Sequence, residues 1–254
     1  ETSLAYAKGI AAAGLIPTAK HFPGLGGLVT DSHRQVARKN SSLEELEARD
    51  LVPFIRYSAQ NFPKAIMMAH LSLPHVDPEG LPATYSEKLI QEILREKYGY
   101  TGLIMTDDLE MGGASISPDV GERAVRAFLA GNDLVMLAGS PANQRRAYEA
   151  MVAAAKQGRI SKHRLDESVS RILEAKNSLH RVPVVPAKSR EIRTKLEALS
   201  REIMRKNFKD ALKSKTSGWP AIEENVQAAV FTSDRRFYAA FAQHFQGRSE
   251  LNIL

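Results

Sequence analysis

The chain has 254 residues, and 35 Lys and Arg against 29 Asp and Glu give a formal net charge of +6. With 43% hydrophobic and 25% charged residues, it has the composition of a globular protein, which excludes disordered, collagenous and coiled-coil chains. The absence of cysteine excludes disulfides, thiolate metal sites, iron–sulfur clusters and cysteine nucleophiles. We expect no membrane span, the N-terminal residues lack a signal-peptide pattern, and the cellular location stays open.

The first 180 residues alternate short apolar runs with longer amphipathic stretches. The runs that we expect to form buried strands are 15–19, 65–69, 102–106 and 133–138. A helix is expected at 3–13, and a capping box of Ser42 and Glu45 predicts another that continues through Leu51. Further helices are expected at 87–98, capped by Ser86, and at 118–130 and 143–157, each ending before a glycine.

Ionisable residues stand at the ends of three of these four runs. They are Lys20 and His21, then His70, then Asp107 and Asp108, whereas Gly139 and Ser140 end the fourth run. Strands that alternate with helices predict an α/β fold with a parallel sheet, and in a β/α barrel the carboxyl ends of the strands carry the active site. We therefore predict the C-terminal half of a (β/α)8 TIM-type barrel over 1–180, as a fragment whose upstream strands are missing.

The pattern changes after residue 180. We expect a linker at 182–186 and a basic helix at about 190–212, which together make up the segment 181–220. A strand at 226–231 and a helix at 235–245 predict the start of a second α/β domain over 221–254. Residues 181–215 hold eleven Lys and Arg against four Asp and Glu. Helical spacing favours a solvated helix face over a nucleic-acid surface, because no aromatic platform or reading motif accompanies the charge.

The segment 20–33 has a composition suited to a tight loop that leaves a strand end. Its glycines match neither the dinucleotide fingerprint nor the P-loop, so a phosphate cradle is disfavoured. A metal site of His21, Asp31 and His33 is also disfavoured, because it lacks a helical pair of ligands. Asp31 and His33 lie two apart, so in extended backbone the carboxylate can orient the imidazole as a general acid/base. The alternative is a turn around Asp31 with an exposed histidine.

Asp107 follows a buried run, and a carboxylate at that place can attack an electrophilic carbon. Its neighbour Asp108 can cap the next turn, so the pair allows one chemical and one structural role. The alternative is that both are helix-start residues.

These motifs resemble glycoside hydrolase family 3, in its β-N-acetylhexosaminidase branch. We expect the sequence to be incomplete at both ends relative to this family, with part of the barrel before it and part of the second domain after it. The resemblance rests on Lys-His-Phe-Pro-Gly at 20–24, Asp-Ser-His at 31–33 and Thr-Asp-Asp-Leu-Glu-Met at 106–111. Met-Ala-His at 68–70 and Pro-Ala-Thr-Tyr-Ser at 82–86 match in order and spacing, so that the resemblance covers about 5–180.

The resemblance implies a retaining mechanism that needs no cofactor and no metal. Asp107 would be the nucleophile, and His33, partnered by Asp31, would be the acid and then the base. Lys20 and His21 would hydrogen-bond sugar hydroxyls, and His70 would line the same pocket. A neutral base does not repel an anionic acceptor, which leaves phosphorolysis open beside hydrolysis.

Two departures from the family pattern stand out. Leu25 occupies a position where many relatives have histidine, which affects loop details only. The upstream strands with further sugar-binding groups are absent from these residues. We therefore expect the segment by itself to be inactive and poorly soluble, because sheet edges and apolar faces stay uncovered.

The resemblance predicts an exo-acting enzyme that releases N-acetylglucosamine from chitin oligosaccharides, glycans or cell-wall fragments. A relative that acts on β-glucosides or β-xylosides is the alternative within the enzyme class, and Asp31-Ser32-His33 disfavours it. A non-catalytic sugar-binding domain is the alternative from another class, with nucleic-acid binding a distant third.

Overall fold

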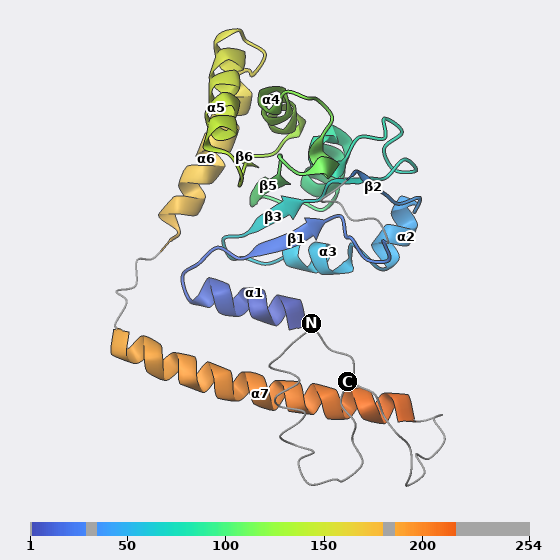
Figure 1. Cartoon of the computed structure of the whole chain (residues 1–254), viewed down its shortest axis with the longest axis vertical. Coiled ribbons are helices and arrows are strands. Elements are labelled where there is room, and N and C mark those ends of the chain that lie inside the picture. Colours follow the sequence, from blue (N-terminus) through green and yellow to red (C-terminus); the bar gives the residue numbers. More distant parts are fainter. Residues whose placement is uncertain (1, 29–34, 180–185, 217–254) are drawn as a thin grey trace. The chain divides into compact units, whose positions relative to one another are not determined.

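The computed structural model describes residues 2–28, 35–179 and 186–216 (Figure 1). Its contacts divide the chain into two units, residues 1–182 and 183–254. In the first unit the elements are α1 (Thr2–Ala12), β1 (Thr18–Phe22), β2 (Ala37–Arg38), α2 (Leu43–Ala48), α3 (Val52–Ser58), β3 (Ala65–Met68), β4 (Leu71–Ser72), η1 (Ala83–Tyr85), η2 (Lys88–Lys97), β5 (Leu103–Asp108), η3 (Gly112–Ala114), α4 (Val120–Ala130), β6 (Leu134–Met136), α5 (Pro141–Lys156) and α6 (Lys162–Asn177).

The main sheet has the order β1-β3-β5-β6, and all of its neighbouring strands are parallel. Helices connect the strands, with α3 beside β1 and α4 beside β6 (Figure 1). The short strands β2 and β4 form a separate parallel pair. The predicted α/β class and the parallel sheet are therefore present in the described residues.

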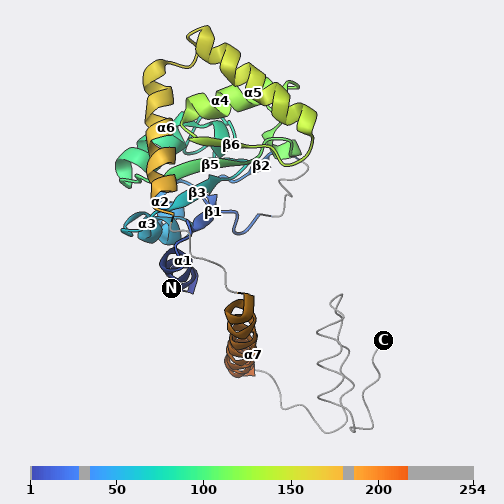
Figure 2. The ribbon, with the colours of Figure 1, turned by 90° about the vertical axis from the view of Figure 1, so that its left-hand side faces the viewer.

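The core of the sheet is apolar on the faces that helices cover. Ile66 and Met68 on β3 and Ile104 on β5 are fully buried, and they pack with Leu89 and Ile90 of η2. A further layer forms where α4 packs along α5, as Figure 2 shows. These strands are near-continuous apolar runs because helices and loops exclude water from them.

The first strand lies three residues later than the apolar run predicts. The carbonyl of Pro17 accepts the N–H of Ala65 at 2.9 Å, and strand pairing then starts at Thr18 opposite Ala65. Leu15 is 59% exposed in the turn before the strand. Lys20 and His21 consequently lie within β1 and not after it, because the hydrogen bonds to β3 set the strand bounds and the apolar run does not.

The predicted helix starts are largely present. Ser42 Oγ accepts the Glu45 N–H at 3.3 Å, and Glu45 Oε2 accepts the Ser42 N–H at 2.9 Å. That helix ends at Ala48, so the expected single helix is two short ones, α2 and α3. Ser86 Oγ accepts the Leu89 N–H at 3.1 Å at the start of η2. This helix is π-helical, with a wider hydrogen-bond spacing than the α-helix expected there.

Asp133 anchors the amino ends of the strands. Its carboxylate is fully buried and accepts hydrogen bonds from Arg95 Nη2 at 2.7 Å, Arg171 Nη1 at 3.0 Å, Ser168 Oγ at 2.7 Å and the Ile104 N–H at 3.0 Å. These groups come from η2, α6 and β5. One carboxylate therefore joins two helices to the sheet at the end opposite Asp107.

In the second unit the structure describes α7 (Pro186–Thr216), which is longer than the predicted helix 190–212. Pro186, expected in the linker, is instead its first residue, a position where proline fits because no N–H is required. Residues 190–203 of α7 are all exposed, with Ile192, Leu196 and Leu199 among them. The rest of the linker and the strand and helix expected at 226–231 and 235–245 lie outside the described residues. In the part of the chain that is described, no helix is long and apolar enough to cross a membrane.

Candidate active site

Three of the ionisable side chains expected in a site meet at the carboxyl ends of β1, β3 and β5. His21 lies near the end of β1, Asp107 near the end of β5, and His70 two residues after β3. His21 Nε2 lies 3.3 Å from Asp107 Oδ2. The two side chains are 23% and 19% exposed, so both remain open to a ligand.

Irregular strand pairing brings His21 and Asp107 together. In β1 an extra residue stands between Lys20 and Phe22 relative to β3, and in β5 an extra residue stands between Met105 and Asp108 relative to β6. Bulges of this kind turn side chains away from the regular alternation. β3 lies between β1 and β5, so the contact reaches across the end of the middle strand.

The adjacent aspartates have different environments. Asp108 Oδ1 accepts the Glu110 N–H at 3.0 Å and the Ala138 N–H at 3.2 Å, which commits its carboxylate to the loops after β5 and β6. Asp107 Oδ1 accepts the Asp108 N–H at 2.8 Å, while its Oδ2 faces His21. Asp108 is therefore held by the backbone of two loops, whereas Asp107 turns Oδ2 toward His21 at the carboxyl ends of the strands.

His70 supports the two aspartates from inside the protein. It is 1% exposed, and its Nε2 lies 3.0 Å from the Asp108 carbonyl, which only accepts. Nε2 therefore carries the proton. Nδ1 lies 2.8 Å from Thr84 Oγ1, a hydroxyl that also lies 3.1 Å from the Ala69 carbonyl and has one proton for these two acceptors.

Burial lowers the pKa of His70 because it removes water from the charged form. The hydrogen bond to the Asp108 carbonyl and the charges of Asp107 and Asp108 act in the opposite direction, and burial outweighs them. The ring is thus held neutral near neutral pH. Neutral His70 fixes the backbone at Asp108, directly after Asp107.

Glu110 is a site residue that sequence reasoning did not single out. Its carboxylate accepts the Gly139 N–H at 2.7 Å, the Ser140 N–H at 3.2 Å and the Asn143 Nδ2 at 2.7 Å. These bonds lower the pKa of Glu110, that with Asn143 most. The loop after β5 is thereby tied to the loop after β6. The signal in the sequence was the spacing of Asp107 and Glu110, which places Glu110 on the loop directly after the strand that carries Asp107.

The remaining predicted residues are placed as follows. Lys20 is exposed on β1 and lines, with His21, a groove of about 1020 Å³ whose other walls come from α1 and α3. Asp31 and His33 lie outside the described residues. Among the residues that are described, no three His, Asp or Glu side chains are grouped as metal ligands.

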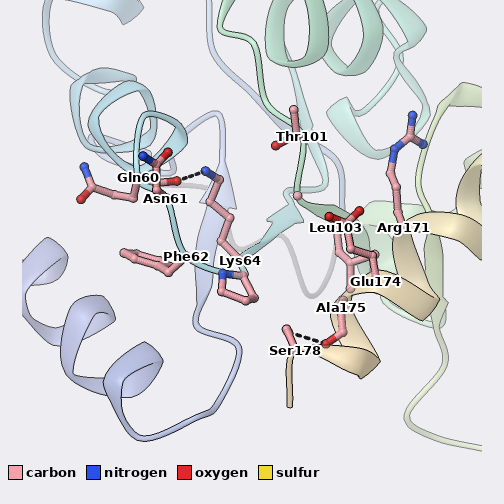
Figure 3. Close-up of a pocket in the computed structure, with 12 residues that line it drawn as sticks. Gln60, Asn61, Phe62, Lys64, Thr101, Leu103, Arg171, Glu174, Ala175 and Ser178 are labelled. Atoms are coloured by element: carbon pink, nitrogen blue, oxygen red, sulfur yellow. Dashed lines mark hydrogen bonds between the residues drawn. The ribbon is translucent and has the colours of Figure 1, made fainter. Parts of the chain in front are cut away.

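A smaller hollow of about 340 Å³ lies at the opposite ends of the strands (Figure 3). Lys64 lies in its wall, and its Nζ donates to the carbonyls of Ser58 and Gln60. Arg171, also in the wall, donates to Asp133. The cations of this hollow are therefore engaged in holding the fold, which leaves the carboxyl ends of the strands as the candidate site.

Comparison with known proteins identifies the family of the chain. Residues 1–175 match the profile described as the Glycosyl hydrolase family 3 N terminal domain. This chain belongs to glycosyl hydrolase family 3. The N-terminal domain of family 3 is a TIM-type barrel, and the parallel strands β1, β3, β5 and β6 with their helices form part of one.

Curated relatives in family 3 carry the name beta-hexosaminidase. One from Pseudomonas aeruginosa is 40% identical over 157 residues, which are 62% of this chain and 45% of the relative. One from Tolumonas auensis is 43% identical over 132 residues, or 52% of this chain and 39% of the relative. The chain thus spans less than half the length of these relatives.

Solved structures share the fold, and one of them is described as a glycoside hydrolase family 3 enzyme. A beta-N-acetylglucosaminidase from Paenibacillus sp. is 38% identical with a TM-score of 0.66, over 71% of this chain and 35% of that chain. A beta-glucoside phosphorylase is 25% identical with a TM-score of 0.66, over 98% of this chain and 48% of that chain.

Proposed function

We propose that the protein carrying this chain is a retaining exo-glycosidase that hydrolyses terminal β-linked N-acetylglucosamine. The observation that carries the proposal is the carboxylate of Asp107, which stands at the end of β5 with one oxygen held by backbone and the other 3.3 Å from His21. The choice of N-acetylglucosamine as the sugar is supported by the match to family 3 and by the identity of about 40% to proteins named beta-hexosaminidase.

In the first step Asp107 Oδ2 attacks the anomeric carbon and the bond to the leaving oxygen breaks. His33, oriented by Asp31, donates a proton to that oxygen, so the aglycone leaves as an alcohol. In the second step His33 takes a proton from water, the water oxygen bonds to the anomeric carbon, and Asp107 is released as a carboxylate. Two displacements retain the configuration of the sugar.

The other site residues have supporting roles in this proposal. Lys20 and His21 lie on one wall at the open end of β1 and donate hydrogen bonds to sugar hydroxyls. Both ring nitrogens of His70 are engaged, by Thr84 and Asp108. We therefore assign His70 the role of holding the end of β5, the strand that carries Asp107, from the buried side of the pocket wall. No cofactor takes part.

The direct test is to trap the covalent intermediate in the full-length protein with a slow fluorinated N-acetylglucosaminide and to map the labelled peptide. We expect the label on Asp107, and Asp107→Gly should lower kcat/KM by about 10³-fold or more. A label on another residue, or an unchanged rate in Asp107→Gly, contradicts the assignment and favours a sugar-binding domain. An aryl N-acetylglucosaminide should turn over faster than the matching aryl glucoside, and the reverse order would reject the choice of sugar.

Phosphorolysis is the second candidate, favoured by the likeness to a beta-glucoside phosphorylase over 98% of this chain. A neutral imidazole base does not repel phosphate, so the glycosyl-Asp107 intermediate would accept either nucleophile. Adding inorganic phosphate and measuring sugar 1-phosphate distinguishes the two reactions. Hydrolysis alone yields the free sugar at a rate that phosphate does not change.

A further inference from the structure

A buried column of hydrogen bonds runs from the end of α4 to the strand that carries Asp107. Asn132, Thr84 and His70 form it, and each of them is at most 1% exposed. Asn132 Nδ2 donates to the Thr84 carbonyl at 2.9 Å, and Thr84 Oγ1 lies 2.8 Å from His70 Nδ1. His70 Nε2 then reaches the Asp108 carbonyl. The column therefore links residues after α4 and β3 to η1 and the end of β5.

The side-chain amide of Asn132 forms the inner end of the column. Its Nδ2 also donates to the Ala127 carbonyl at 2.7 Å, so both amide protons are used. Both partners are carbonyls, which only accept, so the nitrogen and not the oxygen of the amide faces them. Among the described residues Oδ1 has no hydrogen-bond partner, and an unpaired buried acceptor is destabilising. The contribution of this buried amide is therefore its two donors, one of which holds Thr84.

Thr84 is held by its backbone on both sides of its side chain. Its N–H donates to the Ala69 carbonyl at 3.3 Å, and its own carbonyl accepts from Asn132. A β-branched side chain has few rotamers, so a fixed backbone leaves the hydroxyl little freedom. A hydroxyl can donate to a neutral imidazole or accept from a charged one. Thr84 is therefore a partner for His70 Nδ1 in either protonation state.

The outer end of the column fixes the backbone beside the nucleophile. His70 is held at both ring nitrogens, so its ring cannot tilt without losing one of the two hydrogen bonds. The Asp108 N–H donates to Asp107 Oδ1 at 2.8 Å, which makes the orientation of that carboxylate depend on the backbone of Asp108. A displaced Thr84 hydroxyl would thus displace the ring and, through Asp108, the carboxylate.

We propose that Thr84, held from behind by Asn132, is a positioning residue that fixes the His70 ring and thereby the carboxylate of Asp107. This inference rests on the proposed function. Thr84 is fully buried, so it does not touch the sugar. It acts on the attack by the nucleophile and not on protonation of the leaving oxygen, because the column ends at Asp107.

The test measures kcat/KM of the full-length Thr84→Val protein, in which a methyl group replaces the hydroxyl. Two N-acetylglucosaminides are compared, the 2,4-dinitrophenyl glycoside, whose aglycone leaves without a proton, and the methyl glycoside, whose aglycone needs one. We expect kcat/KM to fall by about tenfold on both, because a displaced carboxylate attacks less well whatever the leaving group. A fall on the methyl glycoside alone, or on neither substrate, overturns the proposal.

Two control variants separate positioning from loss of stability. Thr84→Ser retains the hydroxyl and should restore kcat/KM to within about threefold of the wild type. Ser168→Ala removes another buried hydroxyl, which donates to Asp133 Oδ1 at 2.7 Å at the opposite ends of the strands. It should leave kcat/KM on both substrates within about twofold of the wild type. A tenfold fall in Ser168→Ala as well would show that Thr84 only supports the fold.

A double substitution tests the path through the imidazole. In a His70→Leu background the ring is absent, so adding Thr84→Val should lower kcat/KM by less than about twofold more. Asn132→Leu, which removes both amide donors, should likewise lower kcat/KM in the wild type and have little effect in His70→Leu. A full tenfold loss from Thr84→Val in His70→Leu would show that Thr84 acts by another route.

Amide hydrogen exchange gives a readout that does not depend on activity. The Asp108 N–H should exchange at least about tenfold faster in Thr84→Val, while the Ile104 N–H, which Asp133 holds on the same strand, keeps its wild-type rate. If the wild type cleaves neither glycoside, the proposed function is wrong, and the exchange measurement still decides whether Thr84 holds the end of β5. An equal change at both amides, or no change at either, would show that it does not.

Discussion

His70 shows how a buried side chain controls the backbone next to a reactive one. Its Nε2 proton goes to the Asp108 carbonyl, and its Nδ1 lies 2.8 Å from Thr84 Oγ1, a hydroxyl that also lies 3.1 Å from the Ala69 carbonyl. That hydroxyl can donate to Nδ1 or accept from it, so hydrogen bonding alone does not keep the ring neutral. Burial does, because a charged ring would lie in a low-dielectric surrounding.

The lowered pKa of His70 makes stability depend on pH. The unfolded chain binds a proton at His70 near its ordinary pKa of about 6.5, and the folded chain does so only at lower pH. Between these values the unfolded state holds more protons, so stability rises with pH. We expect His70→Gln to remove this part of the rise, which lies below the ordinary pKa, as measured by urea midpoints at several pH values. An unchanged slope would show that the pKa of His70 is the same in the folded and the unfolded state.

Single residues also show the reach of sequence reasoning. The sequence allowed one chemical and one structural role for Asp107 and Asp108, and in the structure Asp108 Oδ1 accepts two backbone N–H groups of the following loops. The contact between His21 and Asp107 could not be predicted, since it depends on two bulges that the apolar pattern does not reveal. The link between Thr84 and Asn132 could not be predicted either, because their hydrogen bond joins residues 48 positions apart.

At the scale of elements, the loops that follow β5 and β6 behave as one body. Glu110 accepts three donors from the start of α5 and the residues before it, and a Cβ at Gly139 would lie 2.8 Å from Glu110 Oε2. Because hydrogen bonds lower the pKa of Glu110, the stability they give is present above its ordinary pKa and is lost as acidification protonates the carboxyl.

Replacing Glu110 should loosen this link without touching the substrate. We expect Glu110→Gln to lower kcat/KM by between about threefold and about 10²-fold and to speed amide exchange at Gly139 and Ser140, because the charge-assisted bonds are lost. Glu96→Gln, at an exposed position of η2, is the control. If the amide of Gly139 exchanges in Glu110→Gln at the wild-type rate, Glu110 does not hold the loop after β6.

Element bounds were predictable where a local signal defines them. The capping box of Ser42 and Glu45 forms as expected, because its partners lie within one turn. The π-helical turns of η2 and the shift of β1 to 18–22 could not be predicted from the sequence, because side-chain packing and strand pairing determine them. The parallel sheet itself followed from the alternation of apolar runs and helices.

For the first unit as a whole, the buried Asp133 carboxylate is the main electrostatic anchor. Removing it would leave the largely buried Arg95 without a carboxylate partner and Arg171 with only Glu167, at 3.9 Å. We expect Asp133→Ala to lower the free energy of unfolding by about 3–5 kcal/mol, measured by urea denaturation. Asp166→Ala, which removes a carboxylate 59% exposed on α6, should change it by less than about 0.5 kcal/mol. An equal change in the free energy of unfolding for the two substitutions would contradict the role of Asp133 as an anchor.

The groove beside β1 predicts how residues 1–254 behave when produced as they stand. Its walls are mostly apolar, and Tyr6 and Leu15 nearby are 74% and 59% exposed. Surfaces of this kind associate in water. We expect this polypeptide to elute larger than a monomer in size-exclusion chromatography and to lack activity on an aryl N-acetylglucosaminide. A soluble, active monomer would contradict the expectation.

The opposite locations of Asp133 and Asp107 have an evolutionary consequence. Arg95 and Arg171 bind Asp133 and so hold η2 and α6 to the amino ends of the strands. The loops at the carboxyl ends can therefore accumulate substitutions without unfolding the sheet. New sugar preferences would then arise by exchanging loop residues at those ends, while the scaffold beneath keeps its inherited sequence.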